Sequence, residues 1–260
     1  MAKPMNNILI NSTLAFISAF LITTFVHELG HYLSYLLFGA NPILFHNYVQ
    51  TPDQALHLHV RIISSLAGPF ISLIQALLFA VIVSKKKSNT VDHLFFLWLS
   101  LLGFVNFFGY LVMTPFSTTG DTGKVAELLS IDFSIRLVIA LIGFVILLWI
   151  IFKVAKNFTN FIPVQNDMEL RAKYVYRLMF FPIIVGSLVN ALLAFPVVAV
   201  LSIVYPATSS YVIMSSFPVI LKSSNHRTTK PDFEDQIMKS MVILLLCALV
   251  LNRFLTLGIG

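Results

Sequence analysis

The feature that most constrains the fold of this chain is a series of apolar segments, most of them long enough to cross a lipid bilayer. Of its 260 residues, 58% are hydrophobic and only 11% are charged, a balance that excludes an ordinary soluble domain. A membrane-spanning helix needs about 20 apolar residues. The candidate segments are Ile8–Phe38, Ile62–Ser84, Leu94–Met113, Ser134–Phe152, Tyr174–Val204, the shorter Ala207–Leu221, and Ile237–Leu257. The sequence therefore predicts an all-α polytopic membrane protein with six or seven transmembrane helices.

The connections between these segments are short and leave no room for a sizeable soluble domain. We expect a single integral-membrane domain over residues 1–260, with a core at 8–131 and additional helices at 134–260. A cleavable signal peptide is not expected, because the first apolar segment itself carries the motif described below. The single cysteine, Cys247, cannot form an intrachain disulfide, and we expect it to be a small buried residue.

The net charge of +6 comes from basic residues that gather between the apolar segments, without the aromatic interleaving of a nucleic-acid surface. Successive connections between membrane-spanning segments lie on alternate faces of the membrane. When the basic residues are assigned to the two faces in this way, one face receives many more than the other. One side holds Lys3, Lys85, Lys86, Lys87, Lys153, Lys156, Arg171, Lys173, Arg177, Lys222, Arg227, Lys230 and Lys239, and the other holds Arg61, Lys124, Arg136 and Arg253. The positive-inside rule then predicts a cytoplasmic amino terminus, in the cytoplasmic membrane of a bacterium. The count assumes that Ala207–Leu221 spans the membrane.

The pentapeptide His27-Glu28-Leu29-Gly30-His31 lies inside the first apolar segment. Ionisable groups at membrane depth are costly unless they face a polar cavity or bind a ligand, so they are functional candidates. On a helix, His27 and His31 are one turn apart on the same face, and each can offer a ring nitrogen to one metal ion. Glu28 is then placed to take a proton from a metal-bound water. The motif predicts one zinc ion per chain and a hydrolytic reaction.

Gly39-Ala40-Asn41-Pro42 ends the first helical run, and a mixed stretch follows to Val60. Alternation from Leu56 to Val60 predicts a short extended segment that puts His57 and His59 on one face. These histidines are interpreted first as solvated loop residues, and second as groups near the metal. Farther along the chain, Asn190 is interpreted as the donor of an interhelical hydrogen bond, with a cavity-facing role as the alternative.

A third metal ligand is needed, because catalytic zinc sites use three protein ligands and one open position. The first three apolar segments return the chain to the membrane face at which the histidines lie, so Asp121 falls in the same leaflet. Two alternatives stay open for the third ligand. Asp121 is also a suitable N-cap residue at the start of a helix, and Glu127 is a second candidate for the ligand.

Three elements, in this order, resemble the site-2 protease family of intramembrane zinc metalloproteases: H-E-L-G-H at 27–31, Ala67-Gly68-Pro69, and Pro115 followed by Gly120-Asp121. The resemblance covers roughly the first half of the chain. It implies His27, His31 and Asp121 as metal ligands, Glu28 as the general base, and peptide-bond hydrolysis in or beside the membrane. The chain departs from the family pattern at Ser72, where the family has Asn, and at Thr122, where it has Gly. The family also usually places its site toward the cytoplasm, whereas the charge count places this one toward the opposite face.

The sequence thus predicts a zinc metalloprotease that acts on a membrane protein or peptide. Two other classes stay open. One is a zinc-dependent membrane hydrolase of lipid amide or ester bonds, and the other is a membrane protein that holds a metal without catalysis. Glu28 disfavours the last class, because a purely structural metal site has no need of it. The oligomeric state is left undetermined.

Overall fold

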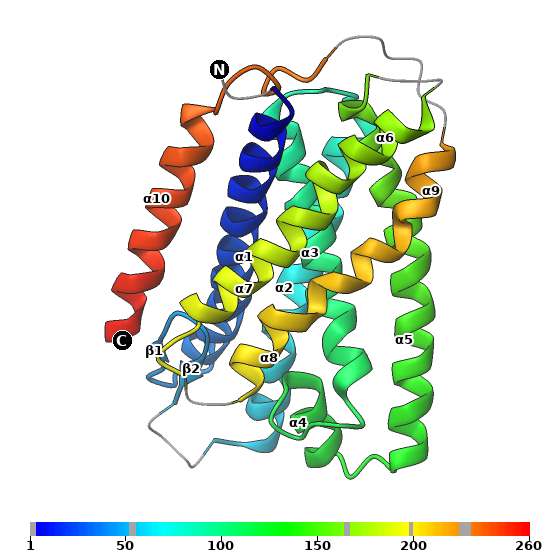
Figure 1. The fold of residues 1–260 in the computed structure, drawn as a ribbon. Coiled ribbons are helices and arrows are strands. Elements are labelled where there is room, and N and C mark those ends of the chain that lie inside the picture. The colour runs from blue at the N-terminus through cyan, green and yellow to red at the C-terminus, as the bar shows by residue number, and fades with distance from the viewer. Residues whose placement is uncertain (1–3, 52–55, 164–166, 198–199, 224–229) are drawn as a thin grey trace.

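The computed structural model describes residues 4–51, 56–163, 167–197, 200–223 and 230–260. It is a helical bundle with a two-stranded hairpin at one end (Figure 1). In chain order the elements are α1 (Pro4–Leu37), β1 (Ile43–Leu44), β2 (Val49–Gln50), α2 (Leu58–Lys85), α3 (Val91–Met113), α4 (Asp121–Leu128), α5 (Phe133–Val154), η1 (Ala155–Phe161), α6 (Met168–Val175), η2 (Tyr176–Phe180), α7 (Phe181–Leu193), α8 (Leu201–Thr208), η3 (Ser209–Ser216), α9 (Phe217–Lys222), α10 (Lys239–Phe254) and η4 (Leu255–Leu257).

Within the described residues, seven helical segments are long and apolar enough to cross a membrane. They are Met5–Leu37, Leu58–Lys85, Val91–Met113, Phe133–Phe161, Met168–Leu193, Leu201–Lys222 and Lys239–Leu257. The predicted all-α polytopic membrane fold is confirmed, and the chain is an integral membrane protein.

The predicted segment Tyr174–Val204 is wrong at both ends. Its helix begins earlier, where the Asp167 side chain accepts a hydrogen bond from the Leu170 amide at 3.0 Å and caps α6. It ends earlier as well, at Leu193, shortly before Pro196, which cannot donate a backbone hydrogen bond to a continuing helix. Residues 201–204, assigned to this segment in the prediction, instead open the next one.

The short segment Ala207–Leu221 is the larger part of that next span, Leu201–Lys222. The span runs from one end of the bundle at α8 to the other at α9 (Figure 1). The connection after it packs against the turn between α2 and α3, where the Asn89 side chain donates to the Lys230 carbonyl and the Val91 amide to Asp232. Ala207–Leu221 therefore crosses the bundle, as the charge count assumed.

The extended segment predicted at Leu56–Val60 is misplaced. The two strands lie earlier, with Ile43 opposite Gln50 and Leu44 opposite Val49, whereas Leu58 opens the first turn of α2. Five alternating residues are too few to outweigh a helical pattern that continues to Lys85. The end of α1 is as predicted, with Gly39 at φ +74° just beyond it.

Helix α1 lies in the middle of the bundle and packs against α2, α3, α7 and α10. Its Phe16 ring meets the edge of Trp98 in α3 at a centroid distance of 5.0 Å, and Trp98 is fully buried. Helices α5 and α10 instead present rows of exposed apolar side chains, such as Leu141 and Val250, as expected of lipid-facing helices. Cys247 lies on α10 and is exposed, so the expectation that it is buried was wrong.

Candidate metal centre

Two histidines of α1 face the interior of the bundle. His27 and His31 are 2% and 6% exposed, and their Nε2 atoms lie 3.0 Å apart. The distance follows from their positions, because residues four apart on a helix lie one above the other. The four-residue spacing in H-E-L-G-H therefore brings both rings to the same side of α1, with their Nε2 atoms close together, as the sequence predicted.

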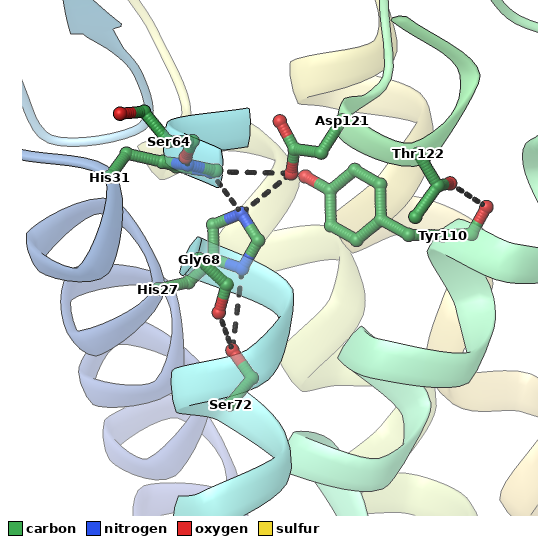
Figure 2. Close-up of polar contacts among 8 residues, drawn as sticks. All are labelled: His27, His31, Ser64, Gly68, Ser72, Tyr110, Asp121 and Thr122. Atoms are coloured by element: carbon green, nitrogen blue, oxygen red, sulfur yellow. Dashed lines mark hydrogen bonds and ion pairs between the residues drawn. The ribbon is translucent and has the colours of Figure 1, made fainter. Parts of the chain in front are cut away.

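The third member of the group is Asp121, the first residue of α4. Its Oδ2 atom lies 3.0 Å from Nε2 of His27 and 3.3 Å from Nε2 of His31 (Figure 2). Thr122 fixes the start of α4 by donating to the Tyr110 carbonyl of α3 at 2.7 Å. The structure thus brings together the three side chains that the sequence analysis named, although His27 and Asp121 are 94 residues apart in the chain.

Asp121 lies in the first turn of α4, as expected of an acidic residue at a helix N-terminus, but it is not the N-cap. Gly120, not Asp121, occupies the N-cap of α4, and no side chain caps this helix. Glu127 is exposed and lies outside the His27–His31–Asp121 group. Burial alone would raise the pKa of Asp121, but in the absence of a metal the positive charge of a protonated imidazole at His31, with the hydrogen bond and charge of His27, holds that pKa well below its usual range. The carboxylate is therefore ionised at neutral pH.

The hydrogen bonds at the far side of each ring determine which nitrogen faces the group. Nδ1 of His31 lies 2.6 Å from the Ser64 carbonyl, which can only accept, so Nδ1 carries the proton. Nδ1 of His27 lies 3.3 Å from the Ser72 hydroxyl. The Ser72 hydroxyl donates its single proton to the Gly68 carbonyl at 3.1 Å. It therefore accepts a hydrogen bond from Nδ1–H of His27. Nε2 of each ring is therefore the nitrogen that faces Asp121 (Figure 2), and in the neutral form that binds a metal it carries a lone pair.

Two lone pairs and a carboxylate that converge in a buried space are an arrangement that a cation stabilises. The three donor atoms lie 3.0 to 3.3 Å apart, close to the separation of about 3.3 Å between tetrahedral ligands held 2.0–2.1 Å from zinc. Donation of each Nδ1–H to an oxygen acceptor is also the usual outer-shell support of metal-binding histidines. The donor set therefore fits a metal ion.

Glu28 is 7% exposed and lines the same cavity as the three donors. In the described part of the chain, no protein group donates a hydrogen bond to its carboxylate. A buried carboxylate without a structural partner is costly. Its position beside the metal group is the one that the motif predicts for a general base.

The Ala67-Gly68-Pro69 element lies where α2 crosses α1. A Cβ atom at Gly68 would collide with the His31 ring, and one at Gly30 would lie 2.7 Å from the Ile71 side chain. Small residues allow this close approach of two membrane helices. The element is a packing motif, and its packing presses α2 against the metal group.

The group opens into a cavity of about 260 Å³. The hairpin turn and α7 both contribute to its wall, as do α3, α8 and α10. The hairpin lines the cavity through residues 46–49, and Thr119 of the turn at 116–119 lines it as well. Helices of the second half of the chain thus complete a cavity that the first half begins.

The sequence analysis did not single out four polar or aromatic residues that line this cavity: Tyr110, His46, Asn47 and Asn106. Tyr110 stacks on His27 with ring centroids 5.1 Å apart and planes 6° apart, and no motif marks it. Asn190 lines the cavity and donates to Gly186 of its own helix, so the interhelical hydrogen bond expected for it was wrong. His57 and His59 are exposed and stacked on each other, apart from the metal group, in accord with the first interpretation.

Comparison of the chain with models of protein families, with curated proteins and with solved structures finds no match.

Proposed function

We propose that this protein is an intramembrane zinc metalloprotease of the site-2 protease type, which hydrolyses peptide bonds of membrane-associated substrates. The proposal rests on one observation: the imidazoles of His27 and His31 meet the carboxylate of Asp121 in the interior of a membrane bundle. The Nδ1 atom of each imidazole contacts an oxygen acceptor, and Glu28 lines the same cavity. A site with two histidines and one carboxylate is a common set for catalytic zinc. The H-E-L-G-H resemblance supports the same assignment.

In this proposal His27, His31 and Asp121 would hold the ion, beside the cavity that they line. When bound, zinc would polarise the scissile carbonyl and increase the acidity of a water molecule. Glu28 accepts the proton of the water that attacks the carbonyl carbon, and it delivers that proton to the amine as the C–N bond breaks. His27, His31 and Glu28 are buried, and electrostatic interactions are stronger at a buried site than in bulk water.

The two ends of the bundle differ in charge. The end with the amino terminus also carries Lys85–Lys87 and Lys239, whereas α4, the hairpin and the last residues lie at the other end (Figure 1). Of the predicted basic set, Lys3 and Arg227 lie outside the described residues. By the positive-inside rule we assign the basic end to the cytoplasm, in a bacterial cytoplasmic membrane, and the metal group to the half nearer the opposite face.

A Glu28→Gln variant tests the proposal directly. It should lose hydrolysis and retain its metal, because Glu28 moves a proton and is not a ligand. Expressed in membranes, it should retain uncleaved substrate, which mass spectrometry of the copurifying proteins and lipids would identify. His27→Ala is the matched control that also loses the metal.

Enrichment of a membrane protein that the wild-type enzyme cleaves supports the protease. Enrichment of a lipid amide or ester, turned over by wild type only, would replace the protease by a lipid hydrolase. Full activity of the Glu28→Gln variant would show that the general base is assigned to the wrong residue.

A further inference from the structure

Three aromatic rings from three helices are stacked beside the metal group. The Tyr110 ring of α3 lies on the His27 ring of α1, with ring centroids 5.1 Å apart and planes 6° apart (Figure 2). Tyr205 of α8 stacks on Tyr110 at a centroid distance of 5.8 Å, with planes 20° apart. We propose that Tyr110 is a positioning residue of the metal centre, whose ring holds the plane of the His27 imidazole. The inference rests on the proposed function, because it concerns a ligand of the same site.

The hydrogen bond between His27 Nδ1 and Ser72 does not fix the imidazole by itself. It anchors one atom, and the ring can still tilt about that contact and move Nε2 away from the other two donors. A parallel ring over the face of the imidazole opposes this tilt, because aromatic pairs favour a stacked arrangement. His31 contacts His27 edge-on, with ring planes 83° apart. The stack with Tyr110 therefore keeps His27 Nε2 directed at Asp121.

Tyr110 is well placed for this role, because other contacts hold it in turn. Its carbonyl accepts hydrogen bonds from the Thr114 hydroxyl at 3.0 Å and from the Thr122 hydroxyl at 2.7 Å. Thr122 directly follows Asp121, so the residue that stacks on one metal ligand also anchors the helix that carries another. Tyr205 supports the ring from α8, in the second half of the chain.

A role in packing alone makes a different prediction. Tyr110 is half-buried and lines the cavity. A side chain that only fills space stabilises the metal-free protein and leaves the zinc affinity unchanged. A side chain that holds a ligand in its binding orientation increases the zinc affinity, because less conformational freedom is lost when the metal binds. Zinc affinity and metal-free stability, measured separately, distinguish the two roles.

The test compares Tyr110→Leu with Tyr48→Leu in full-length protein in detergent micelles. Tyr48 is the matched control, because it is also a half-buried tyrosine that lines the cavity and stacks on a ring. That ring belongs to Phe45, which is not a metal ligand, at a centroid distance of 4.4 Å. Competition with a chelator measures zinc affinity, and thermal unfolding without metal measures stability. Tyr110→Leu should bind zinc about 3- to 10-fold more weakly, the contribution of one aromatic pair, and Tyr48→Leu should keep the wild-type affinity.

Tyr110→Phe separates the ring from the hydroxyl. It keeps the stack on His27, so it should retain the wild-type zinc affinity. Cobalt(II) gives a second readout, because its visible absorption depends on the geometry of its ligands, whereas zinc has a filled d shell and is silent. Tyr110→Leu should change the cobalt spectrum. Tyr110→Phe and Tyr48→Leu should leave it unchanged.

The outcomes separate the two proposals. Equal zinc affinity of Tyr110→Leu and Tyr48→Leu would overturn the positioning role and leave the metal site standing. Zinc binding by Tyr110→Phe as weak as that by Tyr110→Leu would also overturn it, and would assign the effect to the hydroxyl, which points toward the Asp121 carboxylate (Figure 2). Wild-type protein that binds neither zinc nor cobalt would overturn the proposed function, and the positioning role with it.

Discussion

Ser72 holds His27 in a single tautomer. Its hydroxyl donates to the Gly68 carbonyl at 3.1 Å and therefore accepts the Nδ1–H of His27 at 3.3 Å. Ser72 stands where the family that the sequence resembles has Asn. Through this hydrogen bond Ser72 supports a proposed metal ligand without contacting the metal itself.

Replacing Ser72 with alanine should weaken zinc binding about 10- to 100-fold, because loss of an outer-shell partner frees the ligand to rotate and change tautomer. Competition with a zinc chelator measures the affinity. Ser100→Ala is the control, since Ser100 is also a buried hydroxyl that donates to a backbone carbonyl, Ala76, but it lies away from the metal group. Equal affinity of the two variants would remove Ser72 from the site.

Purified protein should contain about one zinc per chain, and His27→Ala or His31→Ala should each remove most of it, because a site with two of its three donors binds far more weakly. Metal analysis by mass spectrometry measures the content. His57→Ala, a change at an exposed histidine, should retain the zinc. Undiminished zinc in both ligand variants would refute the site.

Asp121→Asn should also remove most of the zinc without unfolding the bundle. The substitution keeps the shape of the side chain but removes the charge that faces both imidazoles. Glu127→Gln, an exposed change on the same helix, should leave zinc binding intact. A zinc titration of the two variants decides between them, and loss of metal only in the second would make Glu127 the ligand.

Gly68→Ala should destabilise the protein by about 1–3 kcal/mol, the usual cost of overpacking, and should lower its zinc content. The added methyl group would meet the His31 ring. Thermal unfolding in detergent and metal analysis measure the two effects. Gly109→Ala is the control, because its Cβ would be at an ordinary distance of 3.6 Å from Tyr205. Matching behaviour of the two variants would contradict the close approach of α2 to His31.

The assignment of the basic end to the cytoplasm predicts the labelling of introduced cysteines. In a Cys247→Ser background, Lys86→Cys should react with a membrane-impermeant maleimide only after the membrane is opened, and Lys124→Cys should react in intact cells. The reason is the retention of basic loops on the cytoplasmic side. The reverse labelling pattern would reverse the assigned membrane topology. It would place the metal group in the cytoplasmic half of the membrane, as in the family that the sequence resembles.

The sequence by itself determined the features that depend on local spacing. Apolar length predicted the membrane helices, since a helix must satisfy its own backbone in lipid. The four-residue interval from His27 to His31 predicted two rings on one face, because helical geometry fixes that relation without reference to the rest of the fold.

Only the tertiary structure decided the features that depend on contacts between distant segments. It brought Asp121, and not Glu127, to the two histidines, because the start of α4 is anchored on the end of α3 and turns the aspartate toward α1. It placed the strands at 43–50, where Leu44 also pairs with Ile259 at the far end of the chain. It brought Asn190 and His46 to the cavity of the histidines. No local pattern encodes these positions, because each depends on how helices far apart in sequence pack together.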